Sequence, residues 1–111
     1  MSSSPPLERV CFLLQLRPDR VDDYLKAHDT VWPAMLDALR SAGWRNYSLF
    51  LRPEDGLVVG YLESPDFDRA VSGMAATEVN RRWQQSMAEY FETPGHPDGA
   101  MRRLTEYFHL A

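Results

Sequence analysis

The 111-residue chain has one cysteine, no long apolar run and little basic charge, and each absence excludes a class of protein. A single cysteine, Cys11, cannot form an internal disulfide framework, so a small disulfide-stapled secreted domain is excluded. The longest unbroken apolar run, Val10 to Leu14, is far too short to span a bilayer, so no membrane segment is expected. With 12 basic and 16 acidic residues the formal net charge is −4, whereas a nucleic-acid-binding domain of this size normally has a basic excess.

The usual catalytic and cofactor motifs are also missing. The glycines form no phosphate-binding loop, and no serine lies in a GxSxG turn. Three histidines, His28, His96 and His109, have no partner at metal-ligand spacing, so we expect neither a metal nor another cofactor. We interpret His96 and His109 as structural or exposed, and Cys11 as an inert residue of a core strand. The partner that fits this composition is a neutral or cationic small molecule or another protein.

The composition is typical of one globular domain. Hydrophobic residues make up 44% of the chain and charged residues 25%, and the length leaves no room for a second domain of ordinary size. Residues 1–8 contain three serines and two prolines, and we expect a flexible leader there, followed by a single domain over 9–111. The first residues lack the charged and apolar segments of a secretory signal, which predicts a cytoplasmic protein.

Hydrophobic periodicity predicts both strands and helices. Four segments have the continuous or alternating apolar pattern of a strand: 9–16, 45–52, 57–63 and 101–110. The segments between them have apolar residues at helical spacing and predict four helices: 19–28, a second that ends at Gly43, a short one through 67–71, and 77–91. Because Pro33 cannot lie in a helix interior, we expect a break near His28 and a new helix capped by Asp29 or Thr30.

The resulting order, β-α-β-β-α-β, predicts an α+β, ferredoxin-like fold, in which helices cover one face of an antiparallel sheet. The other face also needs a cover. Tyr47, Leu49 and Leu51 lie on one face of the predicted hairpin, next to an apolar first strand. We therefore expect a homodimer, a dimeric α/β barrel in which two sheets stack face to face.

Tyr24 and His28 lie four residues apart on the inward stripe of the first helix, so their side chains share one face. Two interpretations stay open for this pair. A histidine on an apolar face is by default a buried residue satisfied by a hydrogen bond, and a tyrosine there is usually a core or interface residue. The alternative is a site where the histidine exchanges protons with a ligand.

The segment from Tyr24 to Pro33 resembles the Y-x3-H-[ND]-x-[IV]-W-P pattern of the L-rhamnose mutarotase family. Three further blocks resemble that family in the same order and at its spacing: Gly43-Trp-Arg-Asn-Tyr47, Glu78-Val-Asn-Arg-Arg-Trp83 with Met87, and Glu106-Tyr-Phe-His-Leu110. The blocks lie between about residue 9 and residue 110. Their combination is specific, and it agrees with the predicted order of elements and with a dimer.

The resemblance implies an isomerase that interconverts the α and β anomers of L-rhamnose, a neutral 6-deoxyhexose, without a cofactor. It implies that His28 is the proton donor and that Tyr24, Tyr47 and Trp83 contact the substrate. Opening of the sugar ring requires a proton at the ring oxygen and removal of one from the anomeric hydroxyl. An imidazole with a pKa near 6.5 can move both protons at neutral pH.

One position departs from the family pattern, because Gln84 follows Trp83 where many members have a second tryptophan. An amide can bind a hydroxyl, so Gln84 is a candidate substrate contact, and the alternative is a solvated helix residue. L-Fucose or a related 6-deoxy sugar is therefore an alternative substrate. Two other classes stay open on the same fold: a cofactor-independent oxygenase or haem enzyme, and a metabolite-binding module without chemistry.

Overall fold

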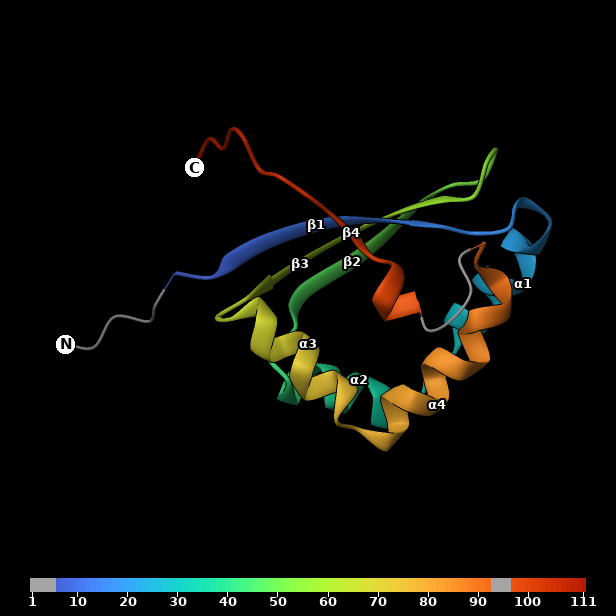
Figure 1. Cartoon of the computed structure of the whole chain (residues 1–111), viewed down its shortest axis with the longest axis horizontal. Coiled ribbons are helices and arrows are strands. Elements are labelled where there is room, and N and C mark those ends of the chain that lie inside the picture. The colour runs from blue at the N-terminus through green and yellow to red at the C-terminus, as the bar shows by residue number, and fades with distance from the viewer. Residues whose placement is uncertain (1–5, 93–96) are drawn as a thin grey trace.

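The computed structural model describes residues 6–92 and 97–111, which form one antiparallel sheet with helices on one of its faces (Figure 1). The strands are β1 (Glu8–Gln15), β2 (Arg45–Arg52), β3 (Leu57–Ser64) and β4 (Arg102–Leu104), and they lie in the order β2-β3-β1-β4. Residues 1–5 of the expected leader lie outside the described part, and β1 begins at Glu8, one residue before the expected boundary.

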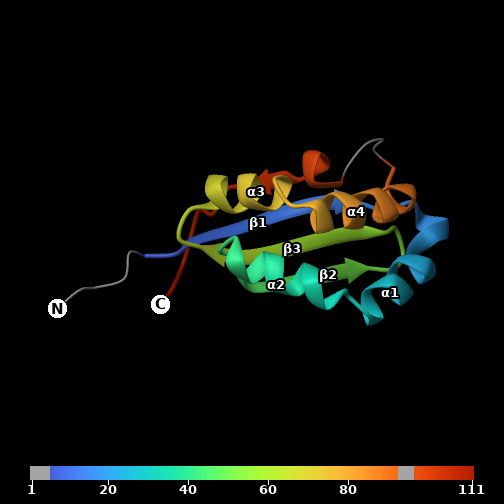
Figure 2. The same cartoon turned by 90° about the horizontal axis from the view of Figure 1, so that it is seen from below.

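The helical layer consists of α1 (Val21–Asp29), α2 (Pro33–Ser41), α3 (Phe67–Ala75) and α4 (Glu78–Met87), with short 3-10 turns at Pro18–Arg20, Ala88–Tyr90 and Pro97–Ala100. These helices lie in front of the sheet when it is seen from below (Figure 2). The predicted α+β, ferredoxin-like order is therefore confirmed. Among the described residues, no helix is long and apolar enough to cross a membrane.

The core lies between this helical layer and one face of the sheet. In β1, Val10, Phe12 and Leu14 are buried against the helices, and their β3 partners continue the same face. Cys11 and Leu13 lie on the opposite face and are partly exposed. Cys11 thus belongs to an inner strand of the sheet, as expected, but its side chain lies on the face that the helices leave uncovered, because side chains alternate along β1.

The hairpin of β2 and β3 turns toward the helices the face that the dimer prediction had placed on the uncovered side of the sheet. Tyr47 and Leu49 line a cavity beneath the helices, and Leu51 shares their face. The uncovered face instead carries Phe50, which is 61% exposed, paired with Val59. The prediction that Tyr47, Leu49 and Leu51 face a second sheet is therefore wrong. Alternation separates the two faces of a strand but does not indicate which face the helices cover.

The last strand is much shorter than the predicted 101–110. Pairing with β1 ends at Leu104, and the Thr105–Ala111 segment has no regular secondary structure and leaves the sheet on the side without helices (Figure 1). Tyr107 and Phe108 in this segment are 96% and 74% exposed. The prediction fails here because this apolar segment finds no surface to cover it within the described part of its own chain.

The break between α1 and α2 follows from Pro33, as predicted, but the predicted caps are wrong. α1 continues to Asp29, with Thr30 as its C-cap, and α2 begins at Pro33 with Trp32 as its N-cap. Trp32 has an extended backbone, with φ −57° and ψ 133°. Steric clash with a following proline disfavours the helical conformation, so α2 cannot begin before Pro33.

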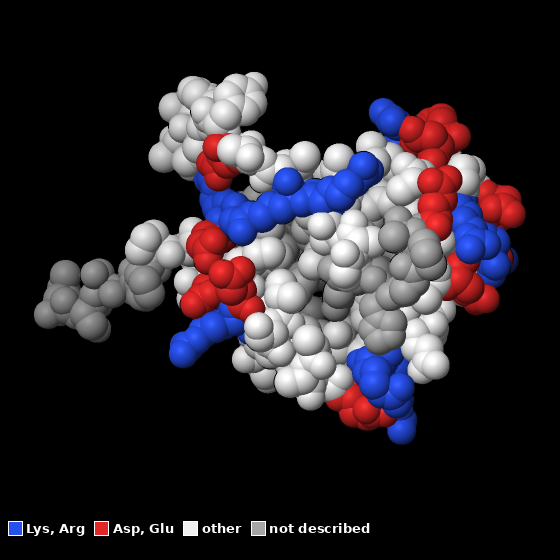
Figure 3. Space-filling view, viewed as in Figure 1, with Lys and Arg blue, Asp and Glu red and all other residues white. Residues whose placement is uncertain are grey.

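Charged side chains of both signs are interspersed on the surface. A band of basic side chains crosses the front of the sheet and has acidic groups beside its one end, and most other charges in this view lie in mixed groups near the rim (Figure 3). Arg103 in β4 pairs with Glu8 at 3.4 Å, and Arg82 in α4 pairs with Glu78 at 3.3 Å. Such exposed pairs contribute little to stability, so the fold depends mainly on its apolar core.

Gly60 in β3 has no side chain, and the ring of Phe12 occupies the space where a side chain at this position would lie. A Cβ atom at Gly60 would lie 2.2 Å from Phe12 Cζ. Phe12 is only 1% exposed, so its ring has no room to move aside. The ring centroid of Phe12 lies 6.5 Å from that of Tyr47, which lines the cavity beneath the helices. Phe12 is therefore a neighbour of the cavity wall.

We expect Gly60→Ala to lower the free energy of unfolding by about 2 kcal/mol or more, as overpacked cores do. Gly99→Ala is the matched control, because a Cβ at Gly99 meets nothing within 4 Å, and it should change stability by less than about 0.5 kcal/mol. Urea unfolding followed by tryptophan fluorescence measures both variants. Equal stability of the two would contradict the tight Phe12–Gly60 contact.

Candidate functional site

A cavity of about 220 Å³ lies between the helices and the sheet. At roughly 30 Å³ per water molecule, this volume suits a small molecule better than a larger ligand such as a nucleotide. Its walls are formed by residues of all four helices, of β2 and of the segments that join α1 to α2 and α2 to β2. These residues are His28, Val31, Met35, Leu36, Leu39, Trp44, Tyr47, Leu49, Met74, Asn80, Trp83 and Gln84. Tyr47 and Leu49 remain 36% and 37% exposed, so the cavity is open to solvent beside the edge strand β2.

Two smaller cavities, of about 120 and 50 Å³, share His28 and Leu49 with the main one. Tyr24 lines both of them. The smaller of the two also includes Trp83 and Gln84 in its wall. The five residues predicted as site residues therefore line three neighbouring cavities, all of which have His28 and Leu49 in their walls.

His28 lies half-buried in the last turn of α1. Its Nδ1 is 3.1 Å from the backbone oxygen of Tyr24. Because a carbonyl oxygen can only accept, Nδ1 carries the proton in this contact, and Nε2 is the nitrogen that can gain or lose one. Burial lowers the pKa of His28 below its usual 6.5, and the hydrogen bond to Tyr24 opposes this shift to a smaller extent. The ring is therefore neutral at pH 7, with a basic Nε2.

Aromatic rings surround the imidazole. The ring centroid of Tyr24 lies 4.3 Å from that of His28, and the indole of Trp83 meets His28 edge-on at 5.4 Å. Trp32 packs edge-on against Trp83 at 5.1 Å. Burial raises the pKa of Tyr24 to about 12, so its phenol keeps its proton at neutral pH. Tyr24 can thus bind a hydroxyl but does not act as an acid or base in this range.

Tyr47 reaches the cavity because β2 contains a bulge. The register between β2 and β3 shifts between Arg45 and Ser48, and Asn46 at this point has a φ of 48°. Asparagine tolerates this left-handed conformation better than most residues, and a bulge re-aims the side chains beside it. The ring of Tyr47 consequently lies on the helix side, 5.0 Å from that of Trp44.

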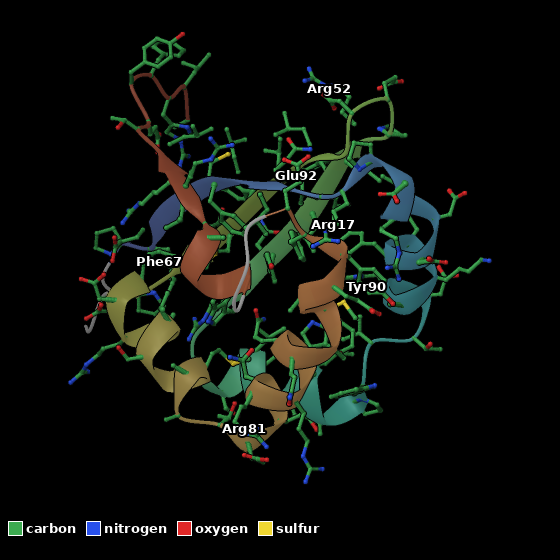
Figure 4. All side chains as sticks on the ribbon, turned by 45° about the vertical axis from the view of Figure 1, so that its right-hand side comes forward. Arg17, Arg52, Phe67, Arg81, Tyr90 and Glu92 are labelled. Carbon is green, nitrogen blue, oxygen red and sulfur yellow. The ribbon has the colours of Figure 1, made fainter. Side chains whose placement is uncertain are left out.

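Hydrogen bonds anchor α4 at both ends. At its start, Thr77 is the N-cap, and its Oγ1 accepts from the backbone nitrogen of Asn80 at 3.2 Å. Beyond its end, the backbone nitrogen of Arg17 donates to the oxygen of Tyr90 at 2.8 Å, and Arg17 Nε donates to the oxygen of Phe91 at 3.0 Å (Figure 4). The first bond caps the start of α4, and the other two tie the turn that follows α4 to the segment after β1.

Gln84 and Asn80 are the polar residues of α4 at the cavity wall. Gln84 is only 7% exposed, so the interpretation as a solvated helix residue is wrong. Sequence patterns did not single out Asn80, which is 4% exposed. Its spacing could have indicated Asn80 as a cavity residue. Asn80 precedes Trp83 and Gln84 by three and four residues and therefore lies on the same face of the helix.

His109, the other histidine in the described part of the chain, does not line this cavity. His109 lies in the C-terminal segment, where its Nε2 is 2.6 Å from Arg9 Nη1. His96 lies outside the described residues. Over 6–92 and 97–111, no three His, Cys, Asp or Glu side chains lie close enough together to hold a metal ion.

Comparison with known proteins matches almost the whole chain to one family. The family model for L-rhamnose mutarotase matches residues 9–110. The L-rhamnose mutarotase of Oceanobacillus iheyensis is 34% identical over 104 residues, which cover 94% of this chain and 99% of that protein.

Two solved structures share the fold. The L-rhamnose mutarotase of Formosa agariphila has a TM-score of 0.77 at 24% identity, covering 94% of this chain and 99% of its own. A dimeric ferredoxin-like protein from an uncultured marine organism has a TM-score of 0.59 at 9% identity, covering 99% and 97%. Since the family model and the Oceanobacillus relative both extend over nearly all of its length, the chain belongs to the L-rhamnose mutarotase family.

Proposed function

We propose that this chain is an isomerase that interconverts the α and β anomers of L-rhamnose in the cavity beside His28. The observation that supports this most directly is the contact of His28 with Trp83 at the cavity wall. The two residues come from different helices and from separate sequence blocks that resemble the family pattern. A half-buried neutral imidazole beside a small cavity is suited to exchanging protons with a neutral ligand.

The proposed reaction begins when His28 Nε2 takes the proton of the anomeric hydroxyl. The C1–O5 bond then breaks while a C1=O double bond forms, and the ring oxygen leaves with the bonding electron pair. The imidazolium donates its proton to that oxygen, so His28 is first a base and then the proton donor. Rotation about C1–C2 presents the other face of the aldehyde, and the reverse steps close the ring as the second anomer.

The aromatic side chains would bind and orient the sugar. Tyr24, as a phenol, can hold a sugar hydroxyl, and Tyr47 can do the same from the opposite layer. The indole of Trp83 can cover the C–H face of the ring or the 6-methyl group. These residues therefore position the anomeric carbon at His28 without taking part in proton transfer.

The decisive variant is His28→Asn, which keeps a polar side chain but cannot titrate near neutral pH. We expect anomer exchange of L-rhamnose, measured by NMR saturation transfer, to fall by at least about a hundredfold. Tyr24→Phe should cost less, since it removes one hydrogen bond of about 1 kcal/mol. His109→Asn is the control and should keep full activity. Near-normal exchange in His28→Asn would place the proton transfer elsewhere.

The pKa of His28 provides a separate prediction. Because burial disfavours the charged ring, its NMR titration midpoint in the folded protein should lie below 6.5. The unfolded chain then binds the proton more readily, so the stability that His28 contributes is complete above pH 6.5. It is lost as the pH falls from 6.5 through the folded-state pKa. Histidine ring spectra of the wild type, with His28→Asn to identify the signal, measure this; a midpoint at or above 6.5 would contradict it.

We further propose that the chain forms a homodimer through the uncovered face of the sheet. This face carries Phe50 at 61% exposure and Leu104 at 44%, and the C-terminal segment that leaves it holds further exposed aromatic residues. Exposed apolar side chains gathered on one face of a sheet are typical of a protein interface. The dimeric ferredoxin-like protein described above shares the fold, which supports a second copy as the partner.

Light scattering at micromolar concentration should give twice the 12.8 kDa chain mass. Leu13→Glu places a charge in the middle of the uncovered face, and we expect it to give a folded monomer, since an unpaired charge at a buried contact is costly. Gln85→Glu, on the exposed side of α4, is the control and should stay dimeric. A monomeric wild type would rule out the proposed interface.

A further inference from the structure

The main cavity has an apolar part that the two smaller cavities do not share. Its residues come from α2, from α3 and from the segments on either side of α2. They are Val31, Met35, Leu36, Leu39, Trp44 and Met74, and we call them the apolar end. His28 lines both smaller cavities, whereas no residue of the apolar end lines either of them. Asn80 also lies at this part of the wall, where its side chain is hydrogen-bonded to Gln84 in the same helix.

Trp44 has the largest side chain of the apolar end, and several contacts hold it. Its Nε1 donates to the backbone oxygen of Ala70 in α3 at 2.9 Å. Because an indole has one polar atom, a donor, this hydrogen bond leaves Trp44 with no polar group for a ligand. The ring centroid of Trp44 lies 5.0 Å from that of Tyr47 and 6.1 Å from that of Phe67, at the start of α3 (Figure 4). Trp44 therefore forms a fixed, apolar piece of wall.

The end of α2 brings Trp44 to this place. Gly43 has a φ of 91°, a left-handed conformation that favours glycine and commonly ends a helix. The backbone nitrogen of Trp44 then donates to the oxygen of Leu39, in α2, at 3.0 Å. This turn places the indole between α2 and the start of β2, where it is only 6% exposed.

The apolar end suits a ligand group that has no hydroxyl. A hydroxyl buried against these six side chains would lose its hydration without gaining a strong hydrogen bond from them. An apolar group, in contrast, gains affinity when it displaces poorly ordered water from such a wall. Carbons C1 to C4 of L-rhamnose each carry a hydroxyl, and only C5 carries an apolar substituent, the 6-methyl group. This methyl group is therefore the part of the sugar that matches the apolar end.

We propose that Trp44 and the apolar end select 6-deoxy sugars, because they receive the methyl group and exclude a hydroxymethyl group at the same position. L-Mannose is the sharpest comparison, since it is L-rhamnose with one added oxygen at C6. A ring held by Ala70, Tyr47 and Phe67 does not move aside for this oxygen. The inference rests on the proposed function, because it takes this cavity as the sugar site.

The first test uses the unaltered protein, so it does not depend on whether a variant folds. L-Rhamnose labelled with ¹³C at C6 is added, and nuclear Overhauser effects (NOEs) from its methyl protons to the protein are recorded. We expect NOEs to the ring protons of Trp44 and to the methyl groups of Met35 and Met74. Saturable binding in which the methyl group shows NOEs to other side chains but none to Trp44 would overturn the proposal.

The second test compares anomer exchange of L-rhamnose and L-mannose. We expect the wild type to have a kcat/KM for L-rhamnose that is about 10- to 200-fold higher, the range in which a pocket discriminates one small group. In Trp44→Phe this ratio should fall by about tenfold. The smaller ring leaves room for the added oxygen, and the backbone oxygen of Ala70 becomes free to accept a hydrogen bond from the C6 hydroxyl.

Val71→Ala is the control for a general loss of packing. Val71 is a partly buried residue of α3, but it lines neither the main cavity nor the two smaller ones. This variant should keep the sugar ratio of the wild type even where its stability falls.

The outcomes separate this proposal from the proposed function. If the wild type does not distinguish the two sugars, or if Trp44→Phe loses activity equally on both, the proposal is wrong. If the wild type accelerates exchange of neither sugar, the proposed function fails. In that case the NOE measurement still decides whether the methyl group binds at Trp44, and a lack of saturable binding would overturn this inference as well.

Discussion

The edge-on contact between the imidazole of His28 in α1 and the indole of Trp83 in α4 connects two helices that cover the same face of the sheet. His28 arrives there because α1 ends shortly after it, at the break that Pro33 imposes. Trp83 is a buried residue of α4, whose start Thr77 caps and whose following turn is bonded to Arg17. The burial that lowers the pKa of His28, and the cavity beside it, both depend on this packing.

Local patterns were sufficient to predict the elements but not which surfaces meet. The apolar run of β1, the position of Pro33 and the helical spacing around Trp83 each follow from short-range physical rules, and the structure agrees with them. The covered face of Tyr47 could not be predicted, because alternation is symmetric between the two faces of a strand. Asn80 was missed because a polar residue on an amphipathic helix is expected in solvent, and its burial depends on the cavity it faces.

The fold itself does not determine the chemistry. A protein that is only 9% identical shares this sheet and its helical layer, and unrelated activities occur on common folds. The cavity side chains make the difference: an imidazole that can exchange protons, phenols and indoles that can hold a sugar, and two amides on α4. His28 comes from α1 and Trp83 from α4, so the cavity wall combines side chains of separate helices.

The most direct measurement is NMR saturation transfer between the α and β anomeric protons of L-rhamnose, with protein first dialysed against EDTA. The account predicts exchange well above the spontaneous rate in buffer, unchanged by the chelator, because proton transfer by His28 needs only side chains of this chain. Exchange equal to that in buffer alone would contradict the account. So would activity that disappears after dialysis and returns with added metal.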